Sequence, residues 1–190
     1  MNYKKDKLST LVSVDIINSY KNIRKNISLI SYASFLLELS EQVERHSNNS
    51  DTFSILISTL KKIDEGYDPL VLMNIVELKY LSLLGVMPNL DSCASCGSAN
   101  DIVTLSNIKG GYICKNCHTT EKIISNKALK LIRTFNYIDI DKISNIDISI
   151  DIKNEINNFL DDYYDTYTGL YLKSKQFLKE LSKVVTDGTI

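Results

Sequence analysis

The sequence lacks the features that mark several large classes of protein. It has no run of about eighteen apolar residues, so no segment is expected to span a membrane. The formal net charge is -1 over 190 residues, so no overall basic field indicates nucleic-acid binding. The segment 8–17 is interrupted by hydroxyls and an aspartate, which does not fit a secretory signal. We therefore expect a cytoplasmic protein whose thiols stay reduced.

Motifs of the common enzyme classes are also missing. The chain has no glycine-rich dinucleotide loop, no P-loop, no nucleophile-elbow serine and no HExxH zinc pair. His46 is expected at a polar helix end, and Asp161 and Asp162 on an exposed helix face that serves solubility. The sequence therefore predicts a binding protein without enzymatic activity.

The cysteines are confined to one short stretch. Cys93 and Cys96 form one C-x-x-C pair, Cys114 and Cys117 form a second, and 17 residues separate the pairs. This spacing is typical of a zinc site with four thiolate ligands. Segments 101–105 and 112–114 have the composition of short strands, and the glycine pair at 110–111 favours a turn between them. The sequence predicts a zinc ribbon at 90–120 that holds one structural Zn2+.

Other interpretations of these cysteines are weaker. The segment 114–118, CKNCH, matches the c-type haem attachment pattern, but haem would require export and would leave Cys93 and Cys96 unexplained. A redox pair would need a βαβ context that neither pair has, and disulfides would suit a secreted protein. His118 is expected beside the site, exposed or as a hydrogen-bond donor, and not as a fifth ligand.

The flanks of the ribbon are predicted to be helical. Apolar periodicity and capping signals place helices at 27–46, 51–66, 68–85, 125–135, 151–169 and 174–185. The buried face of the first is expected to carry Ile30, Ala33 and Leu37, widened by Leu29, Leu36 and Val43. Asp51 is expected to cap the second helix. The third, with Asp68 as its N-cap and Pro69 at its first position, is apolar around most of its circumference and is expected at the centre. The fold class is mainly α, a helical bundle with an inserted four-cysteine ribbon.

Three stretches together resemble one protein family. They are VELKYLSLLGVMPNLDSCASCG (76–97), SYKNIRKNISLISYASFLLELSEQV (19–43) and YYDTYTGLYLKSKQFLKEL (163–181). In this order they are similar to the central helix and first knuckle, the helical entry and the closing segment of the RecO family of bacterial recombination mediators. Members of that family begin with an oligonucleotide-binding (OB) barrel, of which KDKLSTLVSVDII (5–17) matches at most the last strand and exit. We therefore expect little or no barrel, a remnant strand and linker at 1–14, and a helical domain at 15–190.

The resemblance implies a role in DNA repair and homologous recombination. RecO proteins act with RecR, bind the C-terminal tail of single-strand binding protein, help RecA load on single-stranded DNA and anneal strands. Cations that could meet the carboxylate of this tail are Lys79, Arg133, Lys173 and Lys175. Cations that could contact DNA phosphates are Lys4, Lys5, Lys7, Lys21, Arg24 and Lys25.

Plain alternatives exist for each of these features. Every one of the candidate cations also fits a surface charge without a ligand. Four tyrosines near the C-terminus are expected in the core or at an interface rather than as a platform for bases: Tyr163, Tyr164, Tyr167 and Tyr171. The alternative function is a zinc-ribbon scaffold that binds proteins and not DNA.

Overall fold

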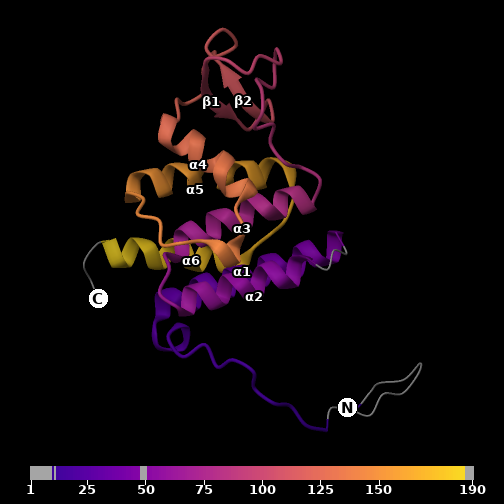
Figure 1. Ribbon diagram of the computed structural model, residues 1–190, viewed down its shortest axis with the longest axis vertical. Coiled ribbons are helices and arrows are strands. Elements are labelled where there is room, and N and C mark those ends of the chain that lie inside the picture. Colours follow the sequence, from indigo (N-terminus) through magenta and orange to yellow (C-terminus); the bar gives the residue numbers. More distant parts are fainter. Residues whose placement is uncertain (1–9, 11, 48–50, 187–190) are drawn as a thin grey trace.

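The computed structural model describes residues 10, 12–47 and 51–186, the last five through their backbone only. This part contains six α-helices and one small sheet (Figure 1). In chain order they are α1 (Ile27–Ser47), α2 (Asp51–Asp64), α3 (Pro69–Leu83), β1 (Ile102–Ser106), β2 (Gly111–Cys114), α4 (Asn126–Tyr137), α5 (Ile150–Tyr167) and α6 (Lys173–Thr186), with 3-10 turns η1 (Ile23–Lys25) and η2 (Ile140–Lys142). The expected helical bundle with an inserted hairpin is confirmed, and Asp51 is itself the first residue of α2.

Helix α3 is the centre of the bundle, as its sequence predicts. Ten of its 15 residues are buried, and α1, α2, α4 and α5 all pack against it. Each large apolar side chain removed from water contributes roughly 1.5–3 kcal/mol. The ribbon stands at one end of the bundle, beyond α4 and α5, while α1 and α2 lie at the other end (Figure 1).

Asp68 fixes the start of α3. Its Oδ1 accepts hydrogen bonds from the backbone N–H groups of Leu70 and Val71, both at 3.0 Å, and Pro69 follows at the first helical position. Its Oδ2 lies 2.6 Å from Nζ of Lys153 on α5. One carboxylate therefore caps the central helix and joins it to α5.

The buried face of α1 differs from the prediction. Ile30 and Leu37 are 37% and 51% exposed, so their expected burial is wrong, whereas Leu36 and Val43 are buried as predicted. Phe35 and Leu39, which the spacing did not select, complete the core of this helix. Apolar residues occupy more than half of the circumference of this helix, so periodicity alone did not determine its orientation. Packing against α2, α3 and α6 selects the buried part.

Helix α6 closes the bundle against α1. Glu38 of α1 accepts hydrogen bonds from the backbone N–H groups of Lys173 and Ser174, at 3.0 and 2.8 Å, and from the Ser174 hydroxyl. Asp161 of α5 was expected on an exposed face, but it is 7% exposed. It can be buried because α6 places Nζ of Lys175 2.6 Å from its carboxylate. Asp162 is exposed as expected.

The segment between α4 and α5 is a loop, as predicted, with η2 as its one helical turn among the described residues. Ile140, Ile143 and Ile148 are buried and hold it against the bundle. Most of the expected remnant strand at 1–14 lies outside the described residues. No helix in the described part of the chain is long and apolar enough to cross a bilayer.

Replacing Asp68 with alanine is expected to destabilise the fold by about 1–2 kcal/mol, because two N–H groups lose their acceptor. Asp68→Asn keeps an oxygen at the cap and removes only the charge that faces Lys153, so it should cost about half as much or less. Urea unfolding followed by circular dichroism measures both variants. Equal losses in the two would show that the ion pair, and not the cap, is what stabilises the helix.

Candidate metal centre and groups of cations

Each C-x-x-C pair forms a tight turn that brings its two cysteines together. In the first, the Cys93 N–H donates to the Ser98 carbonyl at 2.7 Å, and the Gly97 N–H donates to the Cys93 carbonyl at 2.8 Å. Gly97 has φ +76°, a conformation that favours glycine. In the second, the N–H groups of Cys117 and His118 both donate to the Cys114 carbonyl at 3.0 Å.

A short hairpin brings the second turn to the first. β1 and β2 are antiparallel, with Ile102 opposite Cys114 and Ser106 opposite Gly111. Asn89 pairs with β2 at Gly111 through a parallel bridge, in which its carbonyl accepts from the Tyr112 N–H at 2.9 Å. A Cβ atom at Gly111 would lie 2.5 Å from the Asn89 carbonyl oxygen, so this close approach requires glycine.

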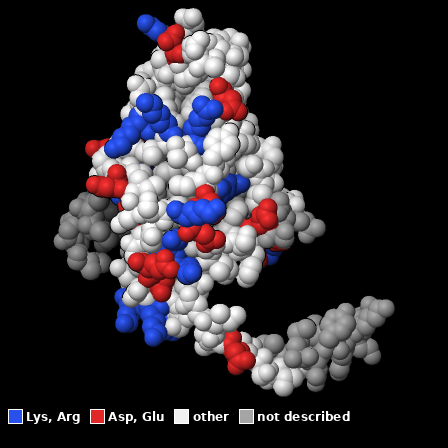
Figure 2. Space-filling view, in the orientation of Figure 1, with Lys and Arg blue, Asp and Glu red and all other residues white. Residues whose placement is uncertain are grey.

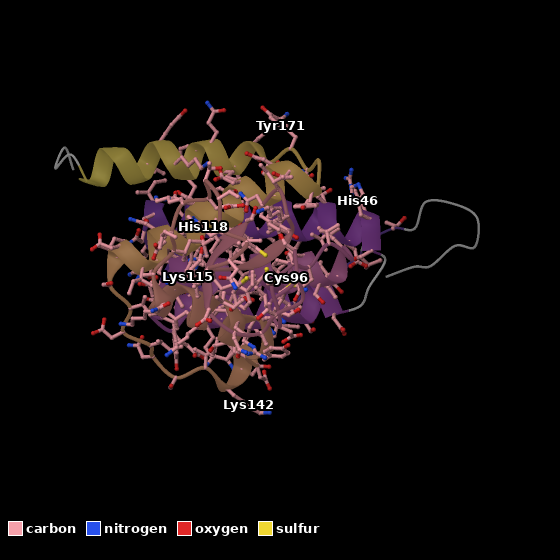
Figure 3. All side chains as sticks on the ribbon, turned by 90° about the horizontal axis from the view of Figure 1, so that it is seen from above. His46, Cys96, Lys115, His118, Lys142 and Tyr171 are labelled. Carbon is pink, nitrogen blue, oxygen red and sulfur yellow. The ribbon has the colours of Figure 1, made fainter. Side chains whose placement is uncertain are left out.

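The four sulfur atoms form one compact cluster. The Sγ atoms of Cys93, Cys96, Cys114 and Cys117 all lie within 4.8 Å of one another. The Cys96 and Cys114 sulfurs are 3.7 Å apart, and all four cysteines are free. A tetrahedral zinc with bonds of about 2.3 Å places its sulfurs roughly 3.8 Å apart. The cluster therefore fits a single metal ion with four thiolate ligands. Figure 3 shows the sulfur atoms near the labelled Cys96.

Hydrogen bonds within the cluster shift the pKa values of two cysteine thiols in opposite directions. Burial alone would raise the pKa of Cys93, but bonds from the backbone of Cys114, Cys96 and Ser95 lower it to about 6. Hydrogen bonds to the sulfurs of Cys96 and Cys114 raise the pKa of Cys117 to about 12. Hydrogen bonding between the sulfurs therefore favours the thiol form of Cys117, and the charge of Cys114 adds to this effect.

His118 lies beside the cluster and is not among its ligands. Its Nε2 is 2.8 Å from the Glu121 carbonyl oxygen. The Glu121 carboxylate lies 2.8 Å from Nζ of Lys109, and Lys109 and the Thr119 N–H lower the pKa of Glu121 to about 2. Lys109 also donates to the Cys117 carbonyl at 3.1 Å. These bonds join the hairpin turn to the segment after the second knuckle.

Tyrosines attach the ribbon to the bundle. The Tyr112 hydroxyl donates to the Leu129 carbonyl of α4 at 2.9 Å, and the Tyr167 hydroxyl to the Ile108 carbonyl at 3.4 Å. Tyr163 stacks on Tyr167 with 4.5 Å between ring centroids. Tyr163 and Tyr164 lie in the core, as one of the two expected positions requires, whereas Tyr171 is 72% exposed and is not a core residue.

The candidate DNA-contacting cations fall into two parts. Lys4, Lys5 and Lys7 lie outside the described residues. Lys21, Arg24 and Lys25 are exposed around η1, and none has an acidic partner within the described part of the chain. Asp64 fixes this turn by accepting from the N–H groups of Asn22 and Ile23 at 2.8 and 2.9 Å. Figure 2 shows Lys and Arg grouped in this region and again over α4.

Two of the four tail candidates border adjoining surface hollows. Lys79 lines a hollow of about 340 Å³ between α2, α3 and the start of the loop after α4. Arg133 lines a second hollow, and both hollows share Tyr137 and Ile138. Arg133 lies 3.0 Å from Asp91, but both side chains are more than half exposed, so this pair is weak. Sequence reasoning did not find Tyr137, which is 67% exposed at the end of α4.

The other two candidates lie on α6. Lys173 is exposed at its first position. The Lys175 side chain is 15% exposed, and its Nζ lies 2.6 Å from Asp161. The structure therefore groups Lys79 with Arg133 and places Lys175 in an internal ion pair.

The chain has clear relatives among known proteins. The family model described as "Recombination protein O C terminal" matches residues 24–176. A DNA repair protein RecO of Listeria monocytogenes is 34% identical over 180 residues, which cover 93% of this chain and 71% of that protein. RecO of Bacillus pumilus is 35% identical over 181 residues, with the same coverage, and RecO of Bacillus cereus is 36% identical over 180 residues, 73% of its length.

Cys93→Ser and Cys117→Ser are each expected to lower bound zinc well below one ion per chain, because one of four thiolates is lost. Metal binding in comparable small modules is worth roughly 10–16 kcal/mol, so amides of residues 90–120 should also lose protection from hydrogen exchange while α1–α3 keep theirs. Zinc is measured by mass spectrometry of the purified protein. Ser95→Ala, within the first knuckle, is the matched control and should keep its zinc. Retention of a full zinc ion by either cysteine variant would contradict the four-thiolate assignment.

Proposed function

The chain belongs to the RecO family of DNA repair proteins, and from this premise we propose that it acts in the cytoplasm as a non-enzymatic recombination mediator. In this role it binds RecR and the C-terminal tail of single-strand binding protein, helps RecA load on single-stranded DNA and supports strand annealing. Zinc, bound by Cys93, Cys96, Cys114 and Cys117, has a structural role. All four positions of its tetrahedron are filled by sulfur, which leaves none for a reactive water.

The observation that carries the proposal is the pair of hollows between Lys79 and Arg133. Their shared wall, Tyr137 and Ile138, offers apolar surface, and a cation stands on either side. A peptide that ends in an apolar side chain and a free carboxylate fits this arrangement, because the side chain packs on the wall while the carboxylate meets a cation.

Two carboxylates, Asp139 and Asp141, also line the hollow of Lys79. The Oδ2 atom of Asp139 lies 3.0 Å from Nζ of Lys142. Hydrogen bonds from Lys142 and from the Asp141 N–H lower the pKa of Asp139. Its charge is therefore balanced within the loop. Burial lowers the pKa of Lys79, and the charge of Asp139 opposes this effect.

Contact with single-stranded DNA is proposed at η1. Lys21, Arg24 and Lys25 point from one exposed turn that Asp64 holds rigid, and Lys4, Lys5 and Lys7 precede it in the chain. Such a group neutralises phosphates and gives little sequence preference. The DNA site and the tail site then lie on different elements, so one molecule can hold both ligands.

A labelled peptide with the tail sequence of single-strand binding protein is expected to bind with micromolar affinity in fluorescence anisotropy, and more weakly at higher salt. Arg133→Gln and Lys79→Gln should each weaken binding by about tenfold, since each removes one charge-assisted hydrogen bond. The same peptide with an amidated C-terminus should lose a similar factor.

Lys115→Gln, on the exposed part of the ribbon, is the control for this experiment and should bind as the wild type does. A folded, zinc-loaded protein that does not bind the peptide would contradict the tail site and would favour a scaffold without this partner. Equal losses in Lys115→Gln and Arg133→Gln would show a diffuse charge effect and no site.

Binding to a labelled oligo-dT is expected to weaken steeply with salt. Each phosphate contact contributes about -0.7 to the slope of log K against log salt for a single strand. The combined variant Lys21→Gln, Arg24→Gln and Lys25→Gln should therefore reduce this slope by roughly 2. Lys61→Gln on α2 serves as the control. A flat response of the wild type, or an unchanged slope in the triple variant, would overturn the DNA site at η1.

A further inference from the structure

One carboxylate is buried at the centre of the bundle without a hydrogen-bond partner. Glu77 of α3 is fully buried, and neither of its carboxylate oxygens accepts a hydrogen bond within the described structure. The amide oxygens of Asn74, one turn earlier on α3, and of Asn157 on α5 are likewise buried and unpaired. This interior is therefore rich in acceptors and poor in donors.

The charges that face Glu77 come from α5 and α6. Nζ of Lys175 is 3.6 Å from its Oε1, but only 2.6 Å from Oδ1 of Asp161. Lys179 lies 2.6 Å from the other oxygen of Asp161. The Tyr164 hydroxyl donates to the backbone carbonyl of Glu77 at 2.8 Å and not to its carboxylate. Both lysines thus lie closest to Asp161. Glu77 interacts with Lys175 only at the longer distance, so this ion pair is the weaker one.

The remaining neighbours of Glu77 do not compensate for its weak interaction with Lys175. Asp165 is a further negative group near Lys175, and α1 places the Phe35 ring 5.9 Å from the ammonium. Titratable groups on the other faces of α3 are engaged elsewhere. The Tyr80 hydroxyl bonds to Ser40 of α1 and the Thr52 carbonyl of α2, and Lys79 donates to the Asn136 carbonyl of α4.

We propose that Glu77 is a reversible proton-binding site, and that loss of its proton loosens α6. With its proton, Glu77 becomes a donor among unpaired acceptors and carries no buried charge. Without it, a charged carboxylate that is fully buried has only Lys175 as a cation, at 3.6 Å, and Asp161 holds the same lysine at 2.6 Å. Lys175 and Lys179 come from α6, so movement of α6 away from α5 gives the ionised carboxylate access to water. This inference does not depend on the proposed function.

The direction of the effect follows from the cause of the pKa shift. Burial is the largest influence and, with the charge of Asp161, raises the pKa of Glu77 from 4.5 to about 7, although Lys175 opposes it. The closed state therefore binds a proton more tightly than a state in which Glu77 is hydrated. Between pH 4.5 and 7 the closed state becomes less favoured as the pH rises, and above that range the difference is constant.

Hydrogen exchange of the α6 amides, corrected for the intrinsic rate at each pH, tests the proposal on the full zinc-loaded chain. If opening restores the ordinary pKa, the α6 opening constant should rise roughly tenfold between pH 6 and pH 8. Glu77→Gln removes the titrating group at nearly constant volume and should make this constant independent of pH in that range. A wild-type constant that does not change, or a Glu77→Gln variant with the same pH dependence, would overturn the proposal.

Glu38→Gln is the matched control, because Glu38 is the second carboxylate that holds α6. Although burial acts to raise it, hydrogen bonds from Ser174 and Lys173 lower the pKa of Glu38, so it stays ionised from pH 6 to pH 8. This variant should loosen α6 equally at every pH and keep the wild-type pH dependence. Should Glu77→Gln fail to fold, carbon-13 NMR of the wild-type glutamate carboxyls gives the same answer. A Glu77 midpoint near 7 supports the proposal, and one near 4.5 refutes it.

Discussion

The whole bundle depends on the burial of α3 on all sides. Water is excluded from most of its circumference, so four other helices must lie against it, and their arrangement leaves little freedom. Its N-terminus is closed by Asp68, whose second oxygen reaches Lys153 of α5. The same burial makes Glu77 exceptional, because a carboxylate that would be ordinary on any outer helix has no water here.

The ribbon has two supports of different kinds. Internally it has a small apolar cluster around Cys93, Ile113 and Cys114, to which a metal ion held by the four cysteines would add. Externally, the Tyr112 hydroxyl joins its hairpin to α4, and the Tyr167 hydroxyl of α5 donates to the carbonyl of Ile108 in the hairpin turn. Metal loss should therefore unfold the knuckles first, while the hairpin keeps some contact with the bundle. Zinc would govern the shape of the ribbon rather than that of the helices.

Local features of the sequence predicted the local structure well. The Asp68 cap, the glycines at the knuckle and hairpin, and the cysteine spacing each act within a few residues, so they could be read directly. Features set by distant partners could not be read in this way. Ile30 and Leu37 had the spacing of a core stripe but lie outside the core. The sequence indicated an exposed Asp161, because it did not show that Lys175 of α6 would pair with this carboxylate. Tyr137 carries no motif at all, and only its position between two hollows draws attention to it.

Which cations are available to a ligand is likewise determined by partners that are distant in the sequence. The candidate cations were equivalent in the sequence, but the fold gives them different contacts. Lys175 neutralises buried carboxylates, and removing it for a ligand would leave Asp161 and Glu77 to share one lysine. Arg133 is joined to a single exposed aspartate, a pair that costs little to break. A ligand carboxylate can therefore compete for Arg133 more readily than for Lys175, which supports the proposed tail site at α4 over one at Lys175.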